Sequence, residues 1–281
     1  MPIIDAQLHA YERNHSGRPW HAVLAGPPEA TGDQTVAMLD ANGVDGAILI
    51  SAFTMYRYDA SYALDVYKKH PTRFALIKPV DPADPAVADT IADWKRTKGA
   101  VAVRMLLARS GLATDVDDPG LNRVLATAAK HSMPVNLHIA GRLGQGIELI
   151  RRHPDTQIVV DHLGIVQPHQ HPVPAEPWAD LSQVLTLAKL PNVVIKITGA
   201  CTLSKEAYPY DDIWDPVCRM IDTFGIDRCL WGTDWSRAIA FLTHKQGVDA
   251  FRETKRISDS DKAKLMGLNT ARVYGWKPGT A

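Results

Sequence analysis

The sequence predicts an α/β protein folded as a closed (β/α)8 TIM barrel. Short apolar runs rich in β-branched residues alternate eight times with stretches of helical character along the 281 residues. The apolar runs are nearly continuous rather than alternating, which is typical of strands buried on both faces of a parallel sheet. Eight such units within this length match a (β/α)8 barrel.

Each predicted strand is an apolar run between turn residues or polar segments. The strands comprise residues 2–8, 44–51, 73–80, 99–106, 134–140, 157–162, 192–198 and 228–235. In a barrel of parallel strands the carboxyl ends all lie at one face, which is the face that carries the active site. Residues near these ends therefore meet although they are far apart in sequence.

The helical stretches between the strands carry recognisable end signals. They include residues 35–43, 117–133, 146–154 and 215–225, and a closing helix within 258–275. The first ends at Asn-Gly, which is a helix C-terminal signal, and the second begins with Asp and Pro, which suit the first positions of a helix.

An open doubly wound sheet is the main alternative fold. Its dinucleotide-binding form has a glycine-rich loop after the first strand, and this sequence has none there. The chain shows no linker and no low-complexity segment, so we expect residues 1–281 to form one domain. Two connections, 10–32 and 163–180, are longer than a barrel requires, and we expect them to form lids or pocket walls.

The composition excludes several classes of function. Thirty-one basic and 31 acidic residues give a formal net charge of zero, which argues against nucleic acid as a partner. No apolar run is long enough to span a membrane, and no signal peptide is visible. Cys201, Cys218 and Cys229 form no C-x-x-C pair, so we expect no disulfide framework and a cytoplasmic location. A homo-oligomer is compatible with the sequence.

Polar side chains interrupt six of the predicted strands at or near their carboxyl ends. A buried charge without a partner costs several kcal/mol, so we expect these groups to neutralise one another around a small-molecule pocket. They are Asp5, Gln7 and His9 on the first strand, Arg104 on the fourth, His138 on the fifth, Asp161 and His162 on the sixth, Lys196 on the seventh and Asp234 on the eighth. In an extended strand the first three would share a face.

Some of these residues have plain structural alternatives. Arg104 and Lys196 could form buried ion pairs, and Asp161 is predicted to cap the turn that follows it. His169 and His171 are predicted to line a pocket wall or face solvent rather than bind metal. Four aromatic residues near the mouth have two equally favoured interpretations. They stack on a ring-shaped ligand, as aromatic pocket walls do, or they only pack at the barrel rim. The aromatic residues near the mouth are Tyr11, Trp20, Trp178 and Trp235.

Several segments together resemble one known family. IDAQLHAY is similar to an I-D-x-H-x-H opening, and GAVAVRML, PVNLHIAG, IVVDHLG, NVVIKITG and FGIDRCLWGTDWS resemble its later strands. LMGLNTARVYGW resembles its closing segment. On these motifs the chain resembles, over nearly its whole length, the amidohydrolase superfamily. The nearest branch is the amidohydrolase-related one, which holds pyrone dicarboxylate, sugar and muconolactone lactonases and metal-dependent decarboxylases.

The resemblance implies roles for individual positions. The positions that hold metal ligands in metal-bearing relatives are here Gln7, His9, His138 and Asp234. His162 falls where relatives orient or deprotonate the attacking water, and Arg104 where lactonases hold a substrate carboxylate or carbonyl. Gln7 departs from the pattern, because an amide offers zinc only a carbonyl oxygen.

Three metal ligands would remain without Gln7, namely His9, His138 and Asp234, and three is a usual count for catalytic zinc. We therefore expect either no cofactor or one weakly held divalent metal, zinc or manganese. An activated ester needs less electrophilic help than an amide, so lactone hydrolysis is the reaction that best tolerates the loss of a metal.

The sequence therefore predicts a hydrolase that opens a small lactone, such as a carboxylated ring compound or a sugar lactone. Asp234 would accept a proton from water, His162 would orient the water, and His9 and His138 would polarise the carbonyl. The predicted substrate-binding residues are Gln7, Arg104, Lys196 and Trp235. The alternatives are a metal-dependent decarboxylase of an aromatic acid and a non-enzymatic binding protein.

Overall fold

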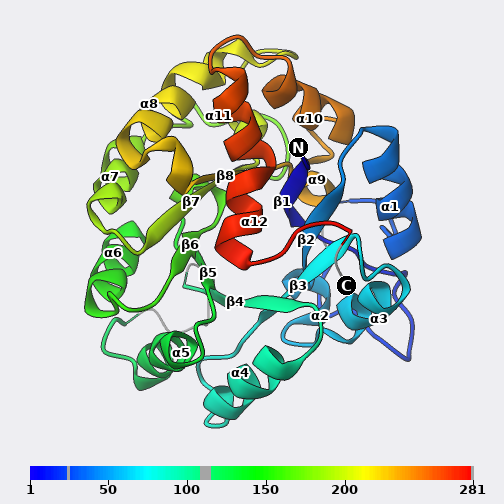
Figure 1. Ribbon diagram of the computed structural model, residues 1–281, viewed down its shortest axis with the longest axis vertical. Coiled ribbons are helices and arrows are strands. Elements are labelled where there is room, and N and C mark those ends of the chain that lie inside the picture. Colours follow the sequence, from blue (N-terminus) through cyan, green and yellow to red (C-terminus); the bar gives the residue numbers. More distant parts are fainter. Residues whose placement is uncertain (24–25, 108–114, 280–281) are drawn as a thin grey trace.

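Eight parallel strands form one sheet in chain order, β1 to β8, and Figure 1 shows the ring that they make. The structure is a computed structural model that describes residues 1–23, 26–107 and 115–279. The strands are β1 (Ile4–Leu8), β2 (Gly46–Ile50), β3 (Phe74–Pro79), β4 (Ala100–Leu106), β5 (Val135–His138), β6 (Ile158–Val160), β7 (Val193–Thr198) and β8 (Cys229–Gly232). The predicted (β/α)8 barrel is confirmed, and all eight strands lie within their predicted ranges.

Helices surround the ring on its outer side (Figure 1). The described α-helices of the chain are α1 (Gly32–Ala41), α2 (Phe53–Tyr56), α3 (Ser61–Lys69), α4 (Val87–Arg96), α5 (Pro119–Lys130), α6 (Leu143–Arg152), α7 (Leu181–Leu185), α8 (Trp214–Phe224), α9 (Trp235–Ala238), α10 (His244–Arg252), α11 (Asp259–Ala263) and α12 (Asn269–Tyr274). The predicted signals act as expected at α5, where the Asp118 side chain accepts from the N–H groups of Gly120 and Leu121 and Pro119 is the first helical residue. None of the described helices is both long and apolar enough to cross a bilayer.

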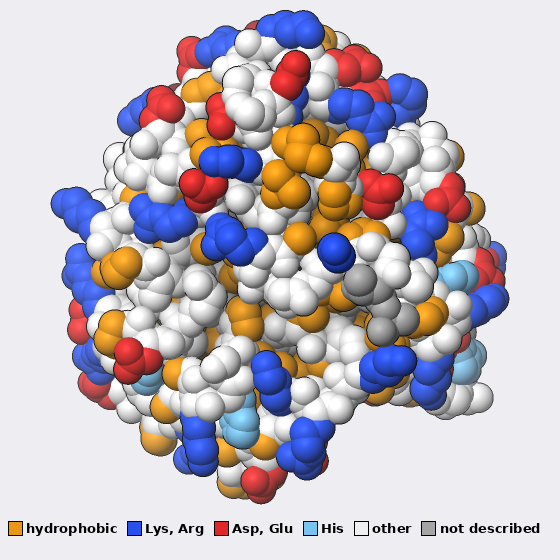
Figure 2. All heavy atoms as spheres, in the orientation of Figure 1, with side chains coloured by type: hydrophobic (Ala, Val, Ile, Leu, Met, Phe, Trp, Pro, Cys, Tyr) orange, Lys and Arg blue, Asp and Glu red, His pale blue; other side chains and the backbone are white. Residues whose placement is uncertain are grey.

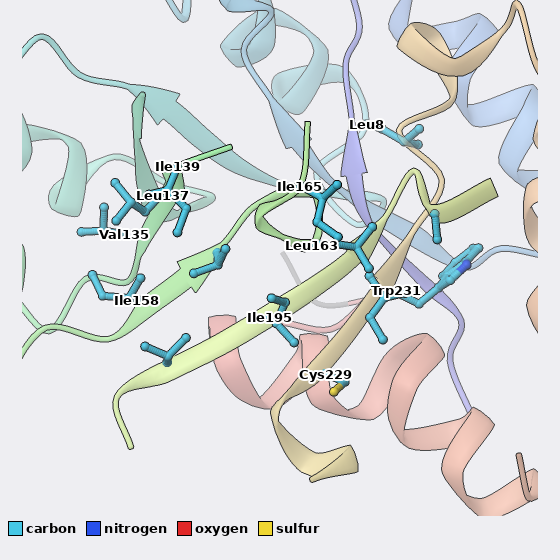
Figure 3. Packing of buried hydrophobic residues seen from close by; sticks show 14 of the residues in the cluster. Leu8, Val135, Leu137, Ile139, Ile158, Leu163, Ile165, Ile195, Cys229 and Trp231 are labelled. Carbon is cyan, nitrogen blue, oxygen red and sulfur yellow. The ribbon is translucent and has the colours of Figure 1, made fainter. Parts of the chain in front are cut away.

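The strands place alternate side chains inside and outside the barrel. On β5, Val135 and Leu137 pack outward in the cluster between strands and helices, which Figure 3 shows together with Ile158 of the neighbouring β6. Asn136 therefore faces the interior, where it bonds to the side chain of Asp161. The same alternation turns Lys196 of β7 inward. An apolar outer face thus fixes which polar residues enter the barrel.

The C-terminal segment closes the end of the barrel opposite the site. Residues 258–275 form α11, a π-helical turn and α12 instead of one uninterrupted helix, and α12 lies across the ring in Figure 1. Tyr274 packs with Ala75 and Leu230 in the interior cluster, and the Gly279 N–H binds the Thr72 carbonyl before β3. Basic and acidic side chains are interspersed over this face (Figure 2).

The seam between β8 and β1 is joined through a side chain. Asp5 accepts hydrogen bonds from the N–H groups of Gln7 and Thr233, both at 3.0 Å, and from the Thr233 hydroxyl. It also lies 3.6 Å from His244 of α10 on the outer side. The prediction that Asp5 shares a face with Gln7 and His9 is wrong, because a register shift between Asp5 and Leu8 interrupts the alternation.

Gly232 is where β8 approaches β1 most closely, and we expect Gly232→Ala to open this seam. A Cβ there would lie 2.7 Å from the Asp5 carboxylate and 2.9 Å from the Gln7 nitrogen. Such overpacking should reduce the free energy of unfolding by about 1–3 kcal/mol in urea titrations. The matched control is Gly144→Ala on α6, where a Cβ meets nothing within 4 Å and should not destabilise. Equal stabilities of the two variants would contradict this account of the seam.

Candidate active site

A cavity of about 350 Å³ opens at the carboxyl ends of the strands. Its lining combines strand-end side chains with the segment after β2 and part of the 163–180 connection. The described lining residues are His9, Ala52, Phe53, Thr54, Met55, Arg104, Leu106, His138, Ala140, Gly141, His162, Ile165, Val166, Gln167, His169, Asp234 and Arg237. The connection 163–180 is therefore a pocket wall, as predicted. No described residue of the 10–32 connection lines the cavity, and residues 24–25 lie outside the described part.

A chain of hydrogen bonds runs beneath this cavity from β7 to β2. Lys196 Nζ donates to Gln7 Oε1 at 2.8 Å, and Gln7 Nε2 lies 3.3 Å from His9 Nε2. His9 Nδ1 lies 2.8 Å from the Ile50 carbonyl oxygen. Lys196 and Gln7 are fully buried, and neither is among the lining residues.

The hydrogen-bond partners determine which atoms of His9 and Gln7 carry the protons. A carbonyl oxygen only accepts, so His9 carries its proton on Nδ1. The Lys196 amine donates to Gln7 Oε1, so the amide NH2 of Gln7 faces His9 and donates to Nε2. Burial lowers the pKa of His9, with Asp234 acting in the opposite direction. His9 is therefore a neutral imidazole whose Nε2 lone pair is held by the Gln7 amide.

Asp161 links Lys196 to Arg104. Its Oδ1 lies 3.2 Å from Lys196 Nζ and accepts from Asn136 Nδ2 at 3.3 Å, and its Oδ2 accepts from Arg104 Nε at 2.7 Å. Burial opposes ionisation of Asp161, but Lys196 and Arg104 hold its pKa far below the usual range. The prediction that Asp161 caps the following turn is wrong, because its side chain makes no capping bond there.

Arg104 connects this cluster to His162. Arg104 Nη2 lies 3.2 Å from His162 Nε2, and a guanidinium only donates, so Nε2 is unprotonated. The proton of His162 is on Nδ1, which lies 3.2 Å from Thr198 Oγ1 and 3.6 Å from Asp234 Oδ2. Burial holds the pKa of His162 well below its usual value, with Asp234 acting in the opposite direction.

Asp234 lines the cavity and keeps one oxygen without a hydrogen bond from the described part of the chain. Its Oδ2 accepts from Arg237 Nε, whereas its buried Oδ1 has no hydrogen-bond partner among the described residues and lies 3.6 Å from His9 Nε2. Burial opposes ionisation of Asp234, but the Arg237 guanidinium beside it lowers its pKa to about 2. The free oxygen is therefore a carboxylate oxygen at neutral pH.

Arg237 and Gln167 were not predicted from the sequence. Arg237 also donates to Gln167 Oε1 and to the Pro168 carbonyl, and Gln167 Nε2 donates to the Thr198 carbonyl at 2.8 Å. The sequence holds one usable signal, since Arg237 lies three residues after Asp234 at the start of α9. The pairing of Arg237 with a loop residue 70 positions away has no such signal.

The predicted residues divide into two groups. His9, Arg104, His138, His162 and Asp234 converge on the cavity, as expected for strand-end side chains, and the ring centroids of His138 and His162 lie 5.5 Å apart. Gln7 and Lys196 lie beneath them. Trp235 stands near the His244 ring and is not among the lining residues, nor are Tyr11, Trp20 and Trp178. His169 lines the wall, and His171 packs on Phe241.

Comparison with known proteins identifies the family of this chain. The protein-family model described as amidohydrolase matches residues 4–276. The chain belongs to the amidohydrolase family.

Two curated relatives within this family are lactone hydrolases. The chain is 23% identical over 253 residues to a 4-sulfomuconolactone hydrolase of Hydrogenophaga intermedia, covering 89% of this chain and 80% of the relative. It is 29% identical over 205 residues to an L-fucono-1,5-lactonase of Burkholderia ambifaria, covering 70% and 67%. An amidohydrolase structure from Burkholderia multivorans with bound zinc matches with a TM-score of 0.80 at 22% identity, covering 98% and 99%, which shows the shared fold.

The donors of this amidohydrolase site do not fit a divalent metal. Of the predicted ligands, His9 has its Nε2 lone pair engaged by the N–H group of Gln7. The neighbouring His162, which was predicted to orient water, has its Nε2 lone pair engaged by Arg104. Asp234 keeps one uncommitted oxygen. Within the described ranges no group of three or more His, Cys, Asp or Glu side chains is arranged to hold a metal ion.

We expect the buried neutral His162 to make folding pH-dependent. The pKa of His162 is lowered in the native state, so below about pH 6.5 this residue binds a proton in the unfolded chain but not in the native state. The free energy of unfolding is therefore unaffected by protonation of His162 above that pH and decreases as the pH falls below it, with a slope approaching 1.4 kcal/mol per pH unit for one proton. His162→Asn should flatten the dependence of unfolding free energy on pH between about pH 6 and 5.

His21→Asn, at an exposed position, is the matched control and should leave the slope unchanged. The same slope in His162→Asn and in the unsubstituted protein would show that His162 is already protonated in the native state.

Proposed function

We propose that this protein is a hydrolase that opens a small lactone carrying an anionic group. One observation carries the proposal: a buried carboxylate oxygen, Asp234 Oδ1, has no hydrogen-bond partner among the described residues, and Asp234 lines a cavity that two guanidinium groups also line. The two curated relatives named above act on lactones, and one of these substrates bears a sulfonate. The roles given below to single residues are part of the same proposal.

Asp234 is the base for the attacking water. A water molecule beside Oδ1 would lie next to the His9 ring, whose Nε2 is 3.6 Å from that oxygen. Arg237 holds the other oxygen and so fixes which one faces the water. A carboxylate with a pKa of about 2 is a weak base, which suits an ester activated by ring strain or conjugation more than an amide.

Arg104 supplies the positive charge for the substrate. Two of its nitrogens are bound to Asp161 and His162, and the cavity wall includes its side chain, which is 5% exposed. The remaining N–H groups can donate to a carboxylate or to the oxygen of the opening lactone. Neutral His9 has no proton to give, because its N–H is held by Ile50. This differs from the predicted role of His9 in polarising the carbonyl.

The charges of the site favour an anionic substrate. Arg104, Lys196 and Arg237 face the carboxylates of Asp161 and Asp234, which leaves an excess of one positive charge among these described groups while both buried histidines are neutral. In a buried site this excess is weakly screened. A lactone with a carboxylate or sulfonate would neutralise it.

The predicted alternatives find less support. A metal-dependent decarboxylase needs a metal, and the lone pair of His9 Nε2 is already engaged by the Gln7 amide. A non-enzymatic binding role does not require the uncommitted oxygen of Asp234. The three cysteines are free in the structure, and we place the enzyme in the cytoplasm on that ground.

A panel of neutral, carboxylated and sulfonated lactones, assayed with and without a chelator, tests the function. We expect hydrolysis of an anionic lactone at a rate that the chelator does not change. Asp234→Asn should lower kcat by about 10²- to 10⁴-fold, because it removes the base, while leaving KM within a few-fold.

The matched control is Asp222→Asn on the exposed face of α8, which should keep the full rate. Hydrolysis by Asp234→Asn at the original rate would refute the mechanism. Activity that disappears with the chelator and returns with added zinc or manganese would favour the metal-dependent alternative.

A further inference from the structure

Lys196 occupies a cation site that the fold has built around it. Its ammonium contacts the carboxylate of Asp161 at 3.2 Å and the amide oxygen of Gln7 at 2.8 Å, and it lies 6.0 Å from the ring centroid of Tyr274. The side chain is fully buried inside the barrel. A carboxylate, an amide oxygen and an aromatic face are three groups that stabilise a positive charge.

Each contact of Lys196 is itself held in place. Tyr274 comes from the closing helix α12, and its hydroxyl donates to Asn136 Oδ1 at 2.9 Å. Asn136 in turn donates to Asp161 Oδ1. The position of the ammonium is therefore set by residues from β1, β5 and α12 and by Asp161, which follows β6, all beneath the cavity floor.

The charge of Lys196 affects Gln7 and His9, the next two residues in the chain of hydrogen bonds. Because Lys196 donates to Gln7 Oε1, the amide can turn only its NH2 toward His9. The Nε2 lone pair of His9 then faces an N–H group instead of an open position near Asp234. A divalent ion beside Asp234 would also add two positive charges to a cluster that already has an excess of one.

We infer that Lys196 is the resident cation of this pocket, and that Lys196 and Gln7 together exclude a divalent metal from the site formed by His9 and Asp234. Lys196 is thus a positioning residue, which acts on His9 through Gln7. The inference concerns the pocket in which we propose lactone hydrolysis, but its test uses no lactone, so either can fail without the other.

Two substitutions together, and not one, should be needed to create a metal site here. Gln7→His alone should not create a metal site, because the new imidazole would lie beside the ammonium that Gln7 Oε1 now accepts. Adding Lys196→Met removes this charge and frees Asp161 Oδ1 from it. The double variant would then present two imidazoles and the free oxygen of Asp234, which is a usual ligand set for zinc.

Zinc affinity, measured by competition with a chromogenic chelator, tests the inference. The purified proteins are first stripped with a chelator, and stoichiometry is measured by elemental analysis after dialysis against zinc. We expect the Gln7→His/Lys196→Met variant to bind one zinc ion on the order of 100-fold more tightly than Gln7→His alone. The unsubstituted protein should retain no stoichiometric zinc.

Two further variants separate charge from folding effects. Gln7→His/Lys196→Arg keeps the positive charge and should not gain affinity. Gln7→His/Lys189→Met removes an exposed lysine and should behave as Gln7→His does. Circular dichroism confirms that each variant is folded.

Three results would overturn the inference. They are one tightly bound zinc ion in the unsubstituted protein, equal affinity in Gln7→His and a folded double variant, or a gain in Gln7→His/Lys196→Arg as large as in the double variant. The first of these needs no substitution, so the inference stays testable even if the double variant does not fold.

Discussion

The mouth of this barrel depends on the buried ammonium of Lys196. It is the one cation that contacts both Asp161 and Gln7 among the described residues. Through Asp161 it helps to hold Arg104, and through Gln7 it sets the orientation of the amide that faces His9. Removing one partner of such a buried pair costs about 3–5 kcal/mol, because the remaining charge is left without compensation. The tautomer of His9 and the charge balance of the site therefore depend on this ion.

The barrel makes this arrangement possible by its two-residue alternation. Strands whose outer faces pack against helices must turn their intervening side chains inward, and near the carboxyl ends those side chains are polar. The interior below is apolar and is closed by Tyr274 of α12. The ion network therefore lies between an apolar plug and a cavity, in surroundings that strengthen each of its hydrogen bonds.

The fold and the convergence of the strand ends could be predicted because both follow from local patterns. Residues such as Arg104, His162 and Asp234 stand out as polar groups in apolar runs, and the barrel brings them together. The role of Arg237 could not be predicted, since its partners lie in a long connection whose path no periodicity determines. Asp5 was misplaced because one register shift reverses the face of a strand residue. The sequence predicts a turn cap at Asp161 because it does not reveal that the partners of this residue, Arg104 and Lys196, come from β4 and β7.

The central claim is that a lysine and a glutamine, rather than a metal ion, determine the state of His9. The most direct test is a long-range ¹H–¹⁵N correlation spectrum of the histidine rings, with His9 assigned by the loss of its signals in His9→Asn. The account predicts a neutral His9 with its proton on Nδ1 at pH 7 and no change in its Nε2 shift when zinc is added. A proton on Nε2, or an Nε2 signal that moves on addition of zinc, would contradict it.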